Sequence, residues 1–337
     1  MKEKKIENID PYNDLFYKGC FYNSFFPIVR HYNKNVSDFL ENDIIVYTTD
    51  NSIQTIDAEY IEIRPVEEIL EQMHIMVKTL TYIDSIVNEV IESLQHNRPV
   101  LLWIDCYYEP ARNDTFQKIH QPHTMLLYGF NKIKEQFHII DHKNSNTLSY
   151  EKRTISFSDL ENCYTGYIKN FNHLYINNSY YAFYVEENPE DTNQEYKRND
   201  ALLDNIMNNR ELIEESLTRL LTFCHSHHSA FDNTASFWDN TELILSSINN
   251  IVNAKKAELY RLTILENIPE EFQGGMNNIL HNWNLVRGII ARVIYSEKYG
   301  VNTMKNITEK LYEIYQLEVS FYQKIFEMKN SYFQHSL

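Results

Sequence analysis

A thiol, an imidazole and a carboxylate occur at three positions where an element of the chain is expected to begin or end. They are Cys20, His123 and Asp141, in that order along the sequence. These three groups are the parts of a nucleophilic site, in which an imidazole activates a thiol and a carboxylate orients the imidazole. These groups can act together only if the surrounding elements bring the three side chains together.

The first of these elements is a helix expected to begin near Cys20. Gly19 precedes the cysteine, and an aromatic run, Phe21-Tyr22-Asn23-Ser24-Phe25-Phe26, follows it. A cysteine at a helix N-terminus lies beside unpaired backbone N–H groups and the positive end of the helix dipole. Both lower a thiol pKa from its usual value of about 8.5.

The other two groups fall on a predicted antiparallel hairpin. His123 opens a strand that continues through Met125 to Tyr128, and Phe137 to Ile140 predicts the next strand, which Asp141 closes. A loop at 131–135 would reverse the chain between them. The hairpin therefore predicts that Asp141 returns beside His123.

Further groups compete for places in such a site. Asp105 ends a predicted buried strand at 100–104 and could support the site or cap a turn, and Tyr107 and Tyr108 just after it are expected to line the substrate. His120 competes with His123 as the base, but it falls in a loop-like stretch. The alternative for any of the cysteines is a small buried apolar side chain.

Composition narrows the class of protein. The chain has 337 residues, 43% of them hydrophobic, and a formal net charge of −16 that divides evenly between its two halves. No basic region is present to bind nucleic acid or an anionic membrane. Four widely spaced cysteines without a C-x-x-C pair indicate reduced thiols in a cytoplasm, and no stretch approaches the roughly 20 apolar residues of a membrane span. We expect a soluble cytoplasmic protein.

The patterns along the chain predict an α+β domain followed by an all-α domain. Short strands are expected at 44–47, 60–63 and 180–185, and the apolar spacing from Val66 to Leu94 predicts one long helix. Strand signals end at the polar segment 186–191. The predicted domains are residues 1–187, a linker at 188–198 and a helical bundle at 199–332, with helices near 199–224, 237–265, 271–297 and 304–328.

The segment Cys224-His225-Ser226-His227-His228 is the one local cluster that could attract a metal ion. Neighbouring helical residues point about 100° apart, so only some of these side chains can converge. We expect a polar helix end here and no metal site in the chain.

Four motifs resemble the N-terminal domain of the butirosin biosynthesis protein H family. They are Gly19-Cys20 before a helix, RPVLLWIDCYYEP at 98–110, HTMLLYGF at 123–130 and FHIID at 137–141. The His and Asp strands are also similar to those of bacteriocin-processing cysteine peptidases, a broader papain-like group. The resemblance covers roughly residues 12–185.

The resemblance implies a papain-like domain with a helix that carries Cys20 and an antiparallel sheet that carries His123 and Asp141. It implies an acyltransferase of natural-product biosynthesis that moves an acyl group from a carrier-protein thioester to an amine. Cys20 would be the nucleophile, His123 the general base and then acid, and Asp141 the orienting group. No cofactor of its own is implied, because phosphopantetheine would belong to the donor.

The sequence departs from the peptidase pattern before the cysteine. Those peptidases usually have a glutamine there as an oxyanion donor, whereas this chain offers Asn13 as a substitute or the backbone N–H of Cys20. A thioester needs less oxyanion stabilisation than a peptide, so the departure favours acyl transfer. A carrier protein is generally acidic, and the lysines expected to face it are Lys132, Lys134 and Lys143, together with Lys152 and Arg153.

Three classes of function stay open: a cysteine acyltransferase or thioesterase, a cysteine peptidase or amidase, and a binding module without activity. The acyl donor, the acceptor and the oligomeric state are not specified by the sequence.

Overall fold

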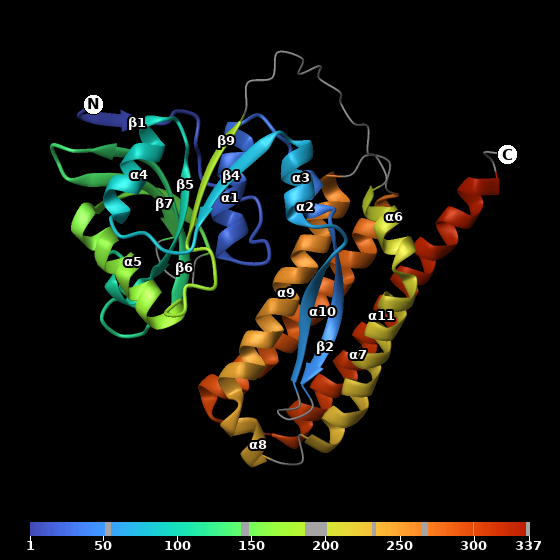
Figure 1. The fold of residues 1–337 in the computed structure, drawn as a ribbon. Helices are drawn as coiled ribbons and strands as arrows, with labels where there is room; N and C mark the ends of the chain where they lie inside the picture. Colours follow the sequence, from blue (N-terminus) through green and yellow to red (C-terminus); the bar gives the residue numbers. More distant parts are fainter. Residues whose placement is uncertain are drawn as a thin grey trace. The chain divides into compact units, whose positions relative to one another are not determined.

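The computed structural model describes residues 1–50, 55–142, 148–185, 201–230, 234–264, 269–298 and 300–334. The chain forms two compact units, each discontinuous in sequence. The first comprises Met1–Val36 and Pro65–Asn193, and the second comprises Ser37–Arg64 and Gln194–Leu337. The expected combination of an antiparallel sheet in the N-terminal half and helices in the C-terminal half is confirmed (Figure 1).

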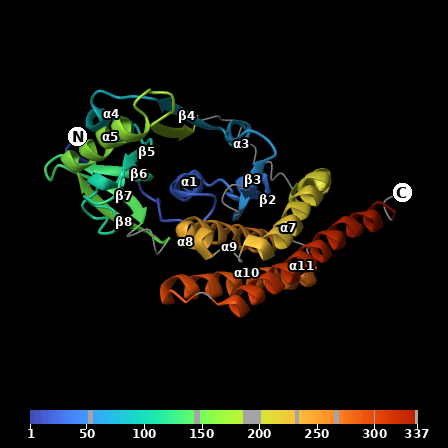
Figure 2. The same cartoon turned by 90° about the horizontal axis from the view of Figure 1, so that it is seen from below.

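The first unit is built on an antiparallel sheet. Its strands lie in the order β4 (Ile75–Leu80), β9 (Tyr180–Val185), β5 (Val100–Asp105), β6 (Pro122–Asn131), β7 (Gln136–His142) and β8 (Tyr150–Ser156), and β1 (Glu3–Lys5) pairs with the end of β6. Helix α1 (Cys20–His31) lies on one side of the sheet, and α4 (Ile86–Gln95) and α5 (Phe157–Phe171) lie on the other (Figures 1 and 2). β5, β6 and β7 are almost entirely buried, which makes them a rigid support for side chains at their ends.

A bulge at Leu127–Gly129 shifts the register between β6 and β7. A Cβ atom on Gly129 would lie 2.8 Å from the carbonyl oxygen of Lys4, so only glycine lets β1 approach this closely. The register nevertheless keeps the start of β6 beside the end of β7.

The prediction of a single long helix from Val66 to Leu94 is wrong. The segment forms α3 (Val66–Gln72), β4 and α4, and His74 between the first two has a positive φ of 56°. A left-handed residue ends a helix. Ile75, Val77 and Thr79 are β-branched and pair with β9 at the sheet edge, so the apolar spacing came from a helix, a strand and a second helix in succession.

The second unit is helical, with a β-hairpin that the predicted all-α domain lacked. Its long helices are α7 (Arg210–Ala230), α9 (Thr241–Ile264), α10 (Glu270–Ser296) and α11 (Val301–Gln334), and α6 (Ala201–Asn208) and α8 (Thr234–Asp239) are short. α2 (Ser37–Leu40) and the hairpin of β2 (Asp43–Asp50) and β3 (Thr55–Glu62) complete it (Figure 1). Both strands were expected, but within the catalytic domain. No helix in the described part of the chain is long and apolar enough to cross a membrane.

Buried polar groups join this hairpin to the helices. The Tyr47 hydroxyl donates to Oε1 of Glu318 at 2.5 Å and accepts from the indole N–H of Trp283 at 3.0 Å. Lys255 in turn lies 2.9 Å from Glu318 and 2.7 Å from Glu258. The hairpin is therefore part of the core of the helical unit rather than a surface addition.

Candidate active site

Helix α1 begins at Cys20, as expected, and the preceding loop is held by a residue inside the helix. Gly19 is the N-cap and offers no side-chain cap, so the first N–H groups of the helix stay available. Asn23 is buried, donates to the Leu15 carbonyl at 2.7 Å and accepts from the Tyr17 N–H at 2.9 Å. Asn23 thus fixes the path of the loop into Cys20, a role that sequence reasoning missed. Cys20 is partly exposed, whereas the other three cysteines are buried.

The hairpin brings His123 and Asp141 together. Nε2 of His123 lies 2.6 Å from Oδ1 of Asp141, and both side chains are buried. The Asp141 carboxylate is also fixed by the backbone N–H of His142, which donates to Oδ1 at 2.7 Å. Because Nε2 is engaged, Nδ1 is the ring nitrogen of His123 left for another partner.

Cys20 lies near enough to His123 that the two groups perturb each other's pKa. Burial raises the pKa of the Cys20 thiol, but the positive charge of His123 and hydrogen bonds from His123 and Thr124 outweigh it and lower that pKa to about 7. For His123, burial opposes the charged form, yet Asp141 and then Cys20 raise its pKa to about 10. Both shifts favour a thiolate beside an imidazolium.

His142 is a second histidine that the sequence analysis did not group with the site. Its ring centroid lies 4.4 Å from that of His123, and its Nε2 lies 3.4 Å from Nδ1 of His123. Burial and the adjacent positive charge of His123 lower the pKa of His142 to about 3. His142 is consequently neutral. Ideal strand alternation would place neighbouring residues on opposite faces, so periodicity gave no reason to group His142 with Asp141, although the side chains of both lie beside His123.

Asp105 has a different partner from the one expected. Its Oδ2 lies 2.7 Å from Nδ1 of His120 and accepts from Asn170 at 2.8 Å, and its Oδ1 accepts the backbone N–H groups of Tyr107 and Gln121. These four contacts use the lone pairs of a fully buried carboxylate. Asp105 therefore organises its own loop and pairs with His120 instead of supporting His123.

The two tyrosines expected to line the substrate pack within this same loop. Tyr107 stacks on His120 with ring centroids 4.2 Å apart, and Tyr108 lies against Gly166 of α5. A Cβ atom on Gly166 would lie 2.4 Å from the Tyr108 ring, so the helix needs glycine there. Their contacts describe a packing role, and contact with substrate stays a prediction.

Asn13 does not have the geometry of an oxyanion donor. Its side-chain N–H donates to the Tyr150 carbonyl at 3.0 Å, and its side-chain oxygen accepts the Tyr150 N–H at 2.8 Å. This pair of bonds ties the N-terminal segment to the start of β8. The backbone N–H groups at the start of α1 are the better candidates for the oxyanion.

The lysines expected to face an acyl donor do not lie together at this site. Lys132 and Lys134 lie in the β6–β7 turn, at the end of β6 opposite to His123, roughly 26 Å away at about 3.3 Å per residue. Lys143 lies outside the described residues. Lys152 and Arg153, on β8 opposite Ile140 and Ile139, are nearer, although Lys152 pairs with Asp10 at 2.6 Å.

A metal site is a second interpretation of part of this cluster. His123, Asp141 and His142 each place a ligand atom within 4.8 Å of the others. Ligand atoms around a tetrahedral zinc ion are about 3.3 Å apart, given bonds of about 2.0–2.2 Å. The 2.6 Å contact between His123 and Asp141 is instead that of a direct hydrogen bond, and we assign it as one.

The cluster at Cys224 does not gather into a ligand set in the described residues. Cys224 is buried, and Nδ1 of His225 is hydrogen-bonded to the Tyr312 hydroxyl at 2.7 Å. The side chains of His227 and His228 lie outside the described residues.

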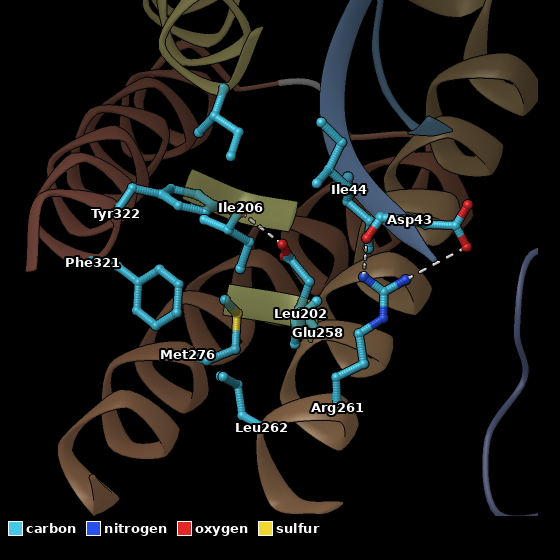
Figure 3. Close-up of a pocket in the computed structure, with 12 residues that line it drawn as sticks. Asp43, Ile44, Leu202, Ile206, Glu258, Arg261, Leu262, Met276, Phe321 and Tyr322 are labelled. Carbon is cyan, nitrogen blue, oxygen red and sulfur yellow. Dashed lines mark hydrogen bonds and ion pairs between the residues drawn. The ribbon is translucent and has the colours of Figure 1, made fainter. Parts of the chain in front are cut away.

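A cavity of about 20 Å³ lies in the helical unit, and residues of that unit line it (Figure 3). Hydrophobic side chains such as Leu202, Met276 and Phe321 line it, together with Glu258 and Arg261. A volume of this size holds about one water molecule, so the cavity is too small for a substrate.

Comparison with protein-family models gives no match, and comparison with curated proteins gives none either.

Proposed function

We propose that this protein is a cysteine-dependent acyltransferase that moves an acyl group from a carrier-protein thioester to an amine through an acyl-Cys20 intermediate. The observation that carries the proposal is the pairing of Cys20 with a His123 side chain whose other nitrogen is held by Asp141. A lowered thiol pKa, a protonated imidazole and a buried carboxylate are the requirements of thiol catalysis.

The reaction would proceed in two balanced steps. The Cys20 thiolate attacks the thioester carbonyl, and the tetrahedral intermediate expels the carrier thiol, which takes the proton of His123. The neutral imidazole then accepts a proton from the amine as the amine attacks the acyl-Cys20 carbonyl. Collapse of the second intermediate releases the amide and restores the thiolate beside imidazolium.

The oxyanion of each intermediate would be stabilised at the start of α1. The N–H groups of its first turn have no intrahelical acceptor, and the helix dipole adds a positive potential there. Removal of a single oxyanion donor typically costs about 10²-fold or more in rate. A thioester, which has a good leaving group, tolerates a weaker arrangement than an amide does.

The deciding experiment is to incubate the full chain with an acyl-pantetheine thioester and measure its intact mass. We expect one acyl adduct on Cys20, none in Cys20→Ser and an unchanged adduct in the matched control Cys224→Ser. Adding an amine should discharge the adduct as an amide, whereas discharge to the free acid would identify a hydrolase. No adduct on Cys20 under any of these conditions would contradict a nucleophilic role.

Docking of a carrier protein is a separate part of the proposal. Lys152 on β8 lies opposite Ile140, the residue before Asp141 on β7, whereas Lys132 and Lys134 lie at the far end of the hairpin. We expect Lys152→Glu to raise the KM for a carrier-bound donor more than Lys132→Glu with Lys134→Glu does. Turnover of acyl-pantetheine, which has no carrier, is the control. Equal KM values for the natural protein and for both variants would show that these lysines do not contribute to docking.

A further inference from the structure

Glu109 is a buried acid beside the candidate site that sequence reasoning did not assign. It follows the 3₁₀ turn η1 (Cys106–Tyr108), and only 1% of its surface is exposed. Neither of its carboxyl oxygens receives a hydrogen bond from a donor group of the described residues, and the same is true of Oδ2 of Asp141. Yet the side chains of Glu109 and Asp141 lie within hydrogen-bonding reach of each other.

The cations around this pair do not neutralise two carboxylates. Arg112 donates from Nε and Nη2 to Asp114 at 3.1 and 3.2 Å, and its backbone N–H donates to the backbone carbonyl of Glu109 at 3.1 Å. Its third nitrogen, Nη1, is buried and has no hydrogen-bond acceptor among the described residues. His123 is committed to Oδ1 of Asp141. If both acids were ionised, one buried carboxylate would have no ion-pair partner, which is a strongly disfavoured state.

One proton on this pair satisfies the contact between the two acids. When two carboxyl groups share a buried site, one of them holds a proton, because two like charges at contact distance disfavour each other. A protonated carboxyl has an O–H donor, which can satisfy an acceptor such as Oδ2 of Asp141.

We propose that Glu109 is protonated in the folded protein and donates its O–H to Oδ2 of Asp141, so that it acts as a positioning residue for the His123–Asp141 pair. Glu109 would lock the rotation of the Asp141 carboxylate, with Oδ1 facing His123. Its effect on catalysis rests on the proposed function, but its protonation does not.

The charged and titratable groups that face Glu109 agree with this assignment. Burial is the largest influence and raises the pKa of Glu109, and the negative charge of Asp141 raises it further, whereas His123 and Arg112 lower it by less. The neighbouring thiols of Cys106 and Cys163 have a raised pKa and stay neutral. The pKa of Asp141 shifts in the opposite direction. Burial raises it, but the positive charge of His123 outweighs burial and lowers the pKa to about 2. The proton therefore belongs to Glu109.

The test that does not depend on catalysis is the pH dependence of stability in Glu109→Gln. A group whose folded pKa is raised gives stability that is fully present below its unfolded pKa, 4.5 for Glu, and is lost as the pH rises toward the folded value. Glutamine keeps an N–H donor for Asp141 but binds no proton. From about one pH unit above 4.5 up to the raised folded value, the unfolding equilibrium constant of the natural protein should therefore rise about tenfold per pH unit relative to that of Glu109→Gln.

Glu151→Gln is the matched control, because Glu151 is exposed on β8 directly opposite Asp141. Its stability curve should run parallel to that of the natural protein. Infrared difference spectroscopy should also find one carboxylic-acid C=O band at neutral pH that Glu109→Gln lacks. Parallel stability curves for Glu109→Gln and the absence of that band would each overturn the proposal.

The positioning role is tested by the pH profile of Cys20 alkylation. Glu109→Leu removes the donor, so the acid limb of the profile should move to higher pH, and Glu109→Gln should restore it because the amide still donates. If Cys20 alkylation had the same pH profile in Glu109→Leu as in the natural protein, Glu109 would have no positioning role. If Cys20 proved unreactive in the natural protein, the proposed function would fail while the stability test of Glu109 would still stand.

Discussion

Nε2 of His123 lies 2.6 Å from Oδ1 of Asp141, across the hairpin of two neighbouring strands. The distance is that of a charge-assisted hydrogen bond, and it fixes which ring nitrogen is available to Cys20. Nδ1 is that nitrogen, and it also faces the neutral ring of His142 at 3.4 Å. The predictions about reactivity depend on this orientation.

The rate of Cys20 alkylation by iodoacetamide should rise through about pH 7 as the thiolate forms and then level off. Loss of the His123 proton near pH 10 should not abolish the reaction, because Cys20 stays a thiolate. Cys224, whose pKa is raised by burial to about 12, is the internal reference and should not react in this range. A Cys20 rate that rises only near the ordinary thiol pKa would contradict the ion pair.

Asp141→Asn should lower both the reactivity of Cys20 and any acyl transfer. Without the carboxylate the pKa of His123 falls, and the thiolate loses its cationic partner at neutral pH. We expect a loss of about 10²–10⁴-fold in turnover, the range associated with a positioned acid–base group. The acid limb of the alkylation profile should shift upward in the same variant, and an unchanged profile would argue against the pair.

The substitution His142→Phe should show whether neutral His142 only packs against charged His123 or also takes part in proton transfer. Phenylalanine keeps the ring contacts with His123 and Tyr150 but cannot hydrogen-bond Nδ1 of His123. If His142 only packs, the alkylation profile should keep its shape, with a rate change of less than about tenfold, the effect of about 1.4 kcal/mol. A much larger loss would make His142 a participant in proton transfer. Zinc inhibition of the natural protein that disappears in His142→Phe would instead favour a metal site.

Asp105→Ala should destabilise the protein without changing the pH profile of Cys20. The change leaves four donors around a buried position without their acceptor, at a cost of about 1–3 kcal/mol for each unsatisfied group. Urea unfolding of the full chain measures the loss. His120→Ala is the comparison, since His120 is about half exposed and should matter less. A shifted pH profile of Cys20 alkylation in Asp105→Ala would instead indicate that Asp105 supports the active site.

Lys255→Met should be the most damaging of these substitutions to the helical unit. It leaves Glu318 and Glu258 without their cation in a buried site, a change that costs about 3–5 kcal/mol. Lys256 is the next residue and is exposed, so Lys256→Met should stay within about 0.5 kcal/mol of the natural protein. Similar unfolding midpoints for the two variants would show that the buried cluster contributes little.

Local patterns were sufficient for the elements that carry Cys20, His123 and Asp141. Each of these residues falls near an element boundary that the sequence marks clearly. Cys20 lies between a glycine and an aromatic run, and His123 and Asp141 lie next to β-branched residues of a strand. The pairing of β6 with β7 follows from one short loop, so the neighbour relation could be deduced without the fold. The helices of the second unit were predicted for the same reason, by periodicity alone.

Non-local contacts were beyond the sequence. Glu109 lies in a polar-looking turn, and nothing local indicates that the turn is buried beside Asp141. Periodicity showed that residues 44–47 have a buried face but not that the covering surface comes from residues more than 150 positions later, such as Ser216 and Glu318. A pattern specifies that a face must be covered, and only the tertiary fold specifies by what.

The hairpin of β2 and β3 has a consequence for the order in which the chain folds. Because Tyr47 contacts Glu318, 271 residues later, an apolar hairpin leaves the ribosome long before its partner helices exist. Contacts of such high sequence separation form late and slowly. During synthesis, the sheet of the first unit can form before the helices of the second unit exist. Until then, residues 37–64 are an insertion in the first unit without their packing partners, and they are exposed to chaperones or to other chains.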